Sequence, residues 1–148
     1  MRDELFELAG MLQWAASMWA FLLFCHFCAD WLGQSNEEAE AKKDNVRVRA
    51  VHCLKYALYM AFPVWVVVAG DWLVWGSSLL LLYSSHYIGD SYRLTLWWAR
   101  RVRHIPEEQM VPGWPMTVIL VVVVDQLWHL AWLWVPAIAS AVLAAPKG

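Results

Sequence analysis

The sequence lacks the features of a secreted or a repeat protein. It has only three cysteines, Cys25, Cys28 and Cys53, and this odd count argues for reduced thiols over a disulfide framework. The first residues, MRDELFE, are acidic, and no small-residue cleavage site follows the first apolar run, so we expect no cleavable signal peptide. There is no internal repeat and no low-complexity tract, which argues against a solenoid.

Charge is also missing from long stretches of the chain, which is 61% hydrophobic. The apolar residues form four blocks, at about 11–31, 48–69, 73–98 and 114–145. Each block meets the requirement of ~20 largely apolar residues for a spanning helix, and each is apolar around nearly its whole circumference. The sequence therefore predicts an all-α polytopic membrane protein, a single transmembrane domain over residues 1–148 built as a four-transmembrane-helix bundle.

The basic residues indicate how the predicted spans cross the membrane. Nine of the 11 Lys and Arg lie in or beside residues 42–55 and 93–103, and the link around residues 70–71 has none. Cytoplasmic loops are enriched in Lys and Arg. We therefore expect the loops at about 32–47 and 99–113 to be cytoplasmic, and both termini to lie on the opposite side of the membrane.

The links between the predicted spans differ in character. The polar segment EEAEAKKDNVRVR, residues 37–49, is expected to be a solvated linker, with a short surface helix as the alternative. The loop HIPEEQMVPGWP, residues 104–115, contains three prolines and should be irregular. The tight link AGDW, residues 69–72, should make the second and third spans antiparallel neighbours.

Histidine and aspartate stand four residues apart in three of the four predicted spans. The pairs are His26 with Asp30, His86 with Asp90, and Asp125 with His129. Residues four apart share one face of a helix. The order reverses in the last span, which runs opposite to the first and third, so every Asp should lie nearer the cytoplasm than its His. His52 joins them from the second span, and we expect one compact polar cluster.

Buried ionisable groups must pair with one another or bind a metal, and imidazole and carboxylate are the usual ligands of Zn, Fe and Mn. The cluster therefore predicts one or two divalent transition-metal ions. The predicted ligands are His26, Asp30, His52, His86, Asp90, Asp125 and His129. In this hypothesis Asp30, Asp90 and Asp125 are the catalytic candidates, one of them as general base. The alternatives are interhelical hydrogen bonds without chemistry, and a relay that moves protons or cations.

Four further polar residues are candidates for accessory roles. They are Gln34, Lys43, Arg93 and Gln126. Gln126 would hydrogen-bond a carboxylate or a substrate, or would only bridge helices. Arg93 would bind an anionic head group or extend to the interface. With Arg100, Arg101 and Arg103 it forms a basic collar that would attract phosphate-bearing lipid or another anionic substrate.

These residues form an ordered set of motifs along the chain. The set is His26-x-x-Ala29-Asp30 followed by Gln34, then Lys43, His52, His86-x-x-x-Asp90 and Asp125-Gln126-x-x-His129. It resembles, over nearly the whole chain, an uncharacterised family of small bacterial and phage-encoded integral-membrane proteins, classed as a domain of unknown function. Lys is expected in that family where this chain has Arg93. The resemblance implies a bacterial inner (cytoplasmic) membrane location and a shared polar site, but no activity.

The leading functional hypothesis is a metal-dependent hydrolase that acts on a lipid-linked or anionic substrate at the cytoplasmic leaflet. The second is a proton, cation or small-solute transporter that uses the same polar cluster. The third is a non-catalytic phage membrane factor for lysis or exclusion. The expected partners are the lipid bilayer and an anionic lipid or lipid-linked substrate, without nucleic acid. A homodimer is an open alternative, because four spans form a thin bundle.

Overall fold

The computed structural model describes residues 2–91, 93–106 and 115–145. Within these residues the chain is helical and contains no strand, so the expected all-α class is confirmed. The elements are α1 (Arg2–Phe27), a π-helical turn η1 (Cys28–Leu32), α2 (Asn36–Ala41), α3 (Val46–Val67), α4 (Trp72–Gly89), α5 (Arg93–Arg101), α6 (Pro115–Trp132) and α7 (Trp134–Ala144).

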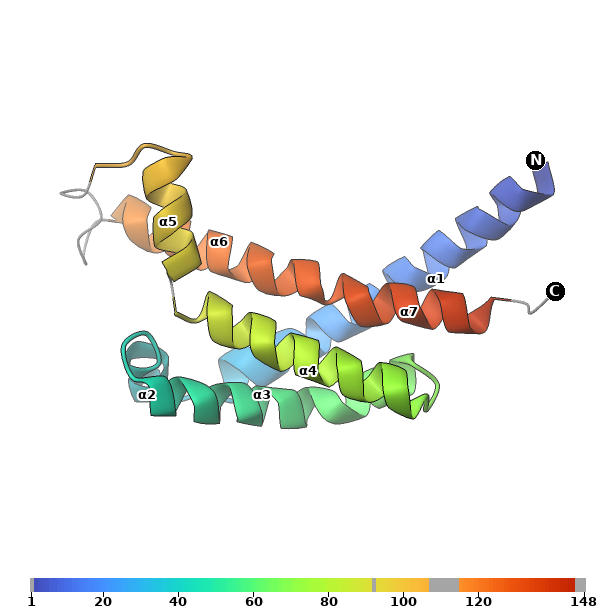
Figure 1. Cartoon of the computed structure of the whole chain (residues 1–148), viewed down its shortest axis with the longest axis horizontal. Helices are drawn as coiled ribbons and strands as arrows, with labels where there is room; N and C mark the ends of the chain where they lie inside the picture. Colours follow the sequence, from blue (N-terminus) through green and yellow to red (C-terminus); the bar gives the residue numbers. More distant parts are fainter. Residues whose placement is uncertain (1, 92, 107–114, 146–148) are drawn as a thin grey trace.

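The long helices pass back and forth, so that the two termini lie at one end of the molecule and α2 and α5 lie at the other (Figure 1). α3 packs on α4, α1 on α7, and α4 on α6. The α3–α4 link is tight because Ala69 and Gly70 adopt positive φ angles of 52° and 77°. Asp71 then caps α4 by accepting a hydrogen bond from the Val74 amide at 2.9 Å. The predicted antiparallel contact between these two helices is therefore present.

Two predicted spans are interrupted. The third, expected at 73–98, ends as α4 at Gly89, and α5 then runs across the end of the neighbouring helices (Figure 1). The Ser91 hydroxyl donates to the Ile88 carbonyl at 2.6 Å, a side-chain bond that competes with helix continuation. The fourth, expected at 114–145, is divided at Leu133, since Pro136 has no amide hydrogen to bond the Trp132 carbonyl.

Part of the fourth predicted span and of the proline-containing loop 104–115 falls on residues 107–114, which lie outside the described residues.

By length and composition, three stretches of the described chain are able to cross a membrane, where the sequence predicts four. They are Glu4–Leu32, Val46–Val67 and Val122–Ala144. α4 is not among them: it is long enough, at 18 residues, but four serines and His86 lower its hydropathy.

Large apolar side chains are exposed on the outer surface of the molecule, and polar side chains are buried inside it. Phe62, Leu73 and Leu80 are exposed, at 73%, 82% and 66%. The interior holds the histidines and aspartates of the three pairs together with an apolar core. That core includes Leu22, Tyr56, Met60, Val64, Leu82, Leu133 and Ala137. An outer surface this apolar marks contact with a membrane or a partner.

The polar segment 37–49 is not the solvated linker that the sequence predicts. Much of it is helical, as α2 and the start of α3, and it buries two of its cations. Asn45 caps α3, and the Arg49 guanidinium donates to the carbonyls of Lys42 at 3.1 Å and Lys43 at 2.9 Å. Arg49 thus holds the α2–α3 turn against the helices, leaving Lys42 only 5% exposed.

Candidate metal centre

The three His–Asp pairs and His52 meet in one buried cluster. Four elements supply them: the end of α1 with η1, the early turns of α3, the end of α4, and α6. None of the seven side chains belongs to a residue more than 7% exposed. The imidazole rings are in contact, with centroids 5.1 Å apart for His52 and His86 and 4.1 Å apart for His86 and His129.

The tightest group of donors is His52, His86 and Asp30. The two Nε2 atoms are 3.0 Å apart, and Asp30 Oδ1 lies 3.2 Å from His52 Nε2 and 3.3 Å from His86 Nε2. Neighbouring donors around a tetrahedral ion with bonds of ~2.1 Å are ~3.4 Å apart. Two ring nitrogens and a carboxylate oxygen at this spacing need a proton or a cation among them, and the spacing fits a transition metal.

Asp90 and His129 extend this group. Asp90 Oδ2 lies 3.3 Å from His52 Nε2 and 3.5 Å from His86 Nε2. The donor atoms of His86, Asp90 and His129 also lie within 4.8 Å of one another, as do those of His26, Asp30 and His129. Neither ring nitrogen of His129 has a hydrogen-bond partner among the described residues. Buried polar atoms normally have one, so His129 is available as a ligand.

A lysine from the α2–α3 turn enters the same cluster. Lys42 Nζ lies 2.9 Å from Asp90 Oδ1, 3.6 Å from Asp30 Oδ1 and 3.2 Å from His52 Nε2. With Asp125, three buried carboxylates share this one ammonium, which leaves an excess of two negative charges if all three are ionised. Buried charge must be compensated, and one divalent cation would balance the excess.

Outer contacts fix the orientation of the two central imidazoles. Glu38 Oε1 lies 3.7 Å from His52 Nδ1, and Lys55 Nζ donates to Glu38 Oε2 at 2.5 Å. A carboxylate beside Nδ1 favours the tautomer whose Nε2 presents its lone pair to a metal. The ring of Tyr56 stacks on His86 with a centroid distance of 4.0 Å. These neighbours hold both Nε2 atoms toward the shared position.

His26 is held in a hydrogen-bonded bridge. The Tyr56 hydroxyl donates to His26 Nδ1 at 3.0 Å, and His26 Nε2 donates to Gln126 Oε1 at 3.3 Å. The Gln126 amide group donates in turn to Asp30 Oδ2 and Asp125 Oδ2, both at 3.4 Å. Because both ring nitrogens of His26 are engaged, this residue is better suited to orient Gln126 and Asp30 than to ligate.

A pocket of about 300 Å³ opens beside the cluster, between η1, α2 and α6. Its lining includes Asp30, Gln34, Lys42, Asp125 and Gln126. The pocket therefore connects the outside of the molecule with a carboxylate of the tightest donor group. Solvent or a small polar group would reach the cluster by this route.

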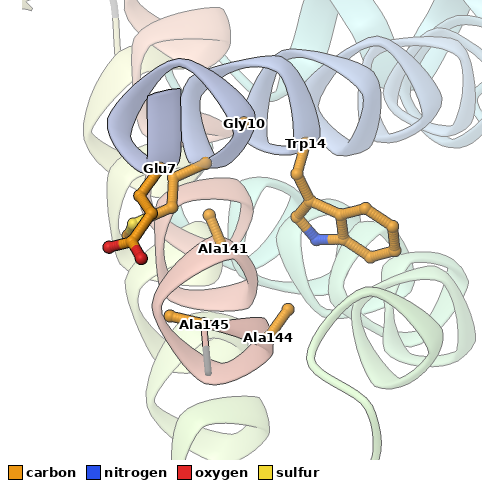
Figure 2. Close-up of a pocket in the computed structure, with 7 residues that line it drawn as sticks. Glu7, Gly10, Trp14, Ala141, Ala144 and Ala145 are labelled. Atoms are coloured by element: carbon orange, nitrogen blue, oxygen red, sulfur yellow. The ribbon is translucent and has the colours of Figure 1, made fainter. Parts of the chain in front are cut away.

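Another pocket of about 300 Å³ lies between α1 and α7, toward the end of the molecule that carries both termini (Figures 1 and 2). Glu7, Gly10 and Trp14 line it from α1, and Ala141 and Ala144 line it from α7 (Figure 2). It offers one carboxylate and no imidazole. It lies away from the end that carries the His–Asp cluster, and we assign it no chemistry.

Most of the chain matches a known sequence family, described as a protein of unknown function (DUF3307), over residues 18–145. The chain belongs to this family. No curated protein and no solved structure matches it. Membership of DUF3307 confirms the expected domain of unknown function, whereas the bacterial or phage origin and the motif set stay predictions. Every residue of the His–Asp cluster, and Lys42, lies within the matched range.

The structure brings two of the four expected accessory residues to this cluster of the DUF3307 chain. Gln126 bridges His26 and two carboxylates, and Gln34 lines the adjacent pocket. Lys43 is exposed, and the neighbouring Lys42 takes the place expected for it. Arg93 is exposed at the start of α5.

Lys42 and Glu38 are site residues that the His–Asp spacing does not reveal. A signal for them was present, because Lys42, the C-cap of α2, stands one helical turn after Glu38. The buried positions Arg49, His52 and Tyr56 likewise follow one stripe of α3.

Proposed function

We propose that this DUF3307 protein is a four-helix transmembrane protein whose His–Asp cluster binds a divalent transition metal, Zn, Fe or Mn. The apolar outer surface supports the membrane location, and α4 is the fourth pass because it packs between α3 and α6. The basic residues near α2 and α5 support a bacterial inner-membrane location with that end, and the cluster, at the cytoplasmic side and both termini on the other side.

One observation carries the metal proposal. The donor atoms of His52, His86 and Asp30 lie 3.0–3.3 Å apart, within a buried cluster whose carboxylates outnumber its ammonium. Pairing among these residues balances that charge only if some of them take up protons, whereas one divalent cation balances it with all three carboxylates ionised. A set of two histidines and one carboxylate is used by zinc hydrolases and by non-haem iron enzymes, with further coordination positions left open.

The proposed activity is metal-dependent hydrolysis of a lipid-linked or anionic substrate. A divalent ion supplies Lewis acidity and activates water for attack. The pocket between η1, α2 and α6 admits the substrate group, and Asp125 on its wall acts as the general base. The basic residues Arg93, Arg100, Arg101 and Arg103 favour a substrate that carries negative charge.

A transporter of protons or cations is the second candidate. It is favoured by the continuous chain of exchangeable groups from Lys42 through His52 to His86, joined by contacts of 3.2 Å and 3.0 Å. Chains of this kind are relay elements in membrane proteins.

Elemental analysis of the full-length protein in detergent tests the metal proposal. We expect stoichiometric Zn, Fe or Mn in the wild type, and its loss in His52→Ala and His86→Ala. His104→Ala is the matched control, because His104 is exposed. Wild-type protein without stoichiometric metal, with thermal stability unchanged in His86→Ala and Asp90→Ala, would contradict the proposal.

A second experiment separates the hydrolase from the transporter. The metal-loaded protein is reconstituted into proteoliposomes, and both hydrolysis of phospholipid ester bonds and proton flux are measured. Hydrolysis that falls at least about 100-fold in Asp125→Asn, as expected for loss of a general base, supports the enzyme. Flux without hydrolysis supports the transporter.

A further inference from the structure

α5 has a buried face and an exposed face. Thr95 and Ala99, four residues apart, are each 2% exposed and form the face turned toward α4 and α6. Trp97 is 56% exposed, and Arg93 and Arg101 stand four residues before and after it. The tryptophan and the two arginines therefore share one exposed face. A helix of this composition that runs across the end of its neighbours is typical of a membrane interface (Figure 1).

An apolar groove of about 340 Å³ lies between α5 and α6. It is lined by Trp97, Trp98, Val124, Leu127, Trp128 and Ala131. None of these side chains is charged, and Leu127 is 60% exposed. Within a bilayer, hydrocarbon fills such a surface, because water beside it is unfavourable.

Trp97 connects the two features, since it lines the groove and shares its helix face with Arg93 and Arg101. A guanidinium pairs with a phosphate through two parallel hydrogen bonds. An apolar groove beside arginines thus matches a ligand with an anionic phosphate and a hydrocarbon chain. We propose that α5 and α6 bind one anionic phospholipid, with its phosphate against Arg93 and Arg101 and an acyl chain in the groove.

This lipid site is separate from the metal centre. The groove uses Val124 and Leu127 of α6, whereas the pocket beside the cluster uses Val122 and Gln126. Residues two apart on a helix point in nearly opposite directions. Trp128 forms part of the groove wall, and its indole donates to the Ser85 carbonyl at 2.9 Å. The proposed lipid therefore contacts α5 and the side of α6 that faces away from the His–Asp cluster. Its binding does not require the proposed hydrolysis.

Native mass spectrometry of the full-length protein tests the proposal. The protein in detergent is mixed with equal amounts of phosphatidylglycerol and phosphatidylcholine that carry the same acyl chains. We expect one retained phosphatidylglycerol, with a preference of about tenfold or more. Both lipids carry a phosphate, but phosphatidylcholine also carries a choline cation beside it, which the two arginines repel. Arg93→Gln with Arg101→Gln should abolish this preference, and Leu127→Trp should reduce retention of both lipids by filling the groove.

The matched controls are Arg47→Gln and Leu58→Trp on α3, because both side chains are exposed and lie away from α5. Equal retention of the two lipids by the wild type would overturn the proposal, as would wild-type preference in the double arginine variant. Binding of inorganic phosphate that is unaffected by Leu127→Trp, without lipid retention, would also overturn it. Metal content is measured in the same samples and should be unchanged, so failure here is distinguishable from failure of the metal proposal.

Discussion

Lys42 sets the charge balance of the cluster when no metal is present. Its ammonium lies 2.9 Å from Asp90 and 3.6 Å from Asp30, and all three residues are buried. Lys42→Met should lower the free energy of unfolding by about 3–5 kcal/mol, the cost of leaving buried charge without its partner. Unfolding in detergent with a chelator present measures the change.

Lys43→Met is the control for this prediction. Lys43 is exposed, and substitutions at such sites usually stay within about 0.5 kcal/mol of the wild type. Equal effects of the two substitutions on the free energy of unfolding would show that Lys42 does not compensate the carboxylates of the cluster. Added metal should restore part of the stability lost in Lys42→Met, because a divalent ion compensates the same carboxylates.

Glu38 positions His52 without touching the proposed metal. Its carboxylate lies 3.7 Å from His52 Nδ1 on the side of the ring away from Nε2. Glu38→Gln should weaken metal affinity about 10–100-fold, the usual effect of removing an outer carboxylate from a ligating histidine. Competition with a chromogenic chelator measures this affinity. The neighbouring Glu37→Gln is the control, since Glu37 is exposed, and an equal loss in both variants would show a general charge effect.

Among the helices, the contact of α4 with α6 depends on Gly89. A Cβ at this position would lie 2.7 Å from His129 Nε2 and 2.9 Å from Trp128 Cδ1. Gly89→Ala should therefore displace His129, lower the free energy of unfolding by about 1–3 kcal/mol and weaken metal binding. Gly76→Ala in the same helix meets no atom within 4 Å and should stabilise α4 by up to about 1 kcal/mol. Thermal unfolding that shifts in the same direction for both variants would refute this account.

The course of the helices could be predicted from sequence better than their ends. The apolar blocks predict helices along the long passes, and the AGDW link predicts the α3–α4 contact. The break at Leu133 was not predicted, because it lies inside an apolar run. The break at Ser91 was not predicted, because His86, Asp90 and Arg93 keep the spacing of one helix face across it. Burial of Lys42, in the turn that follows α2, was not predicted either. It depends on Arg49 bonding the turn carbonyls, a tertiary contact without a periodic signal in segment 37–49.

At the scale of the whole molecule, the meeting of the three His–Asp pairs in one cluster could be predicted, because it depends on the direction in which each helix runs. His26, His86 and His129 each keep an Asp four residues away, and the order reverses where the pass reverses. Local spacing does not determine which ring nitrogen faces which carboxylate. That choice follows from neighbours on other helices, such as Tyr56 against His86 and Gln126 against His26. The sequence therefore predicts the members of the cluster better than their separate roles.

The proposed direction of insertion rests on the same arrangement. Both termini lie at the end opposite α2 and α5, and basic residues concentrate at the α2 and α5 end (Figure 1). Positively charged loops stay in the cytoplasm, so the termini should be outside it. In a variant with all three cysteines replaced, Glu4→Cys and Glu40→Cys place single thiols at the two ends of the molecule. A membrane-impermeant maleimide on cells with a permeabilised outer membrane should label Glu4→Cys alone, and both variants after the inner membrane is opened. Labelling of Glu40→Cys alone would indicate the opposite topology. Equal labelling of both variants before the inner membrane is opened would contradict a cluster that faces only the cytoplasm.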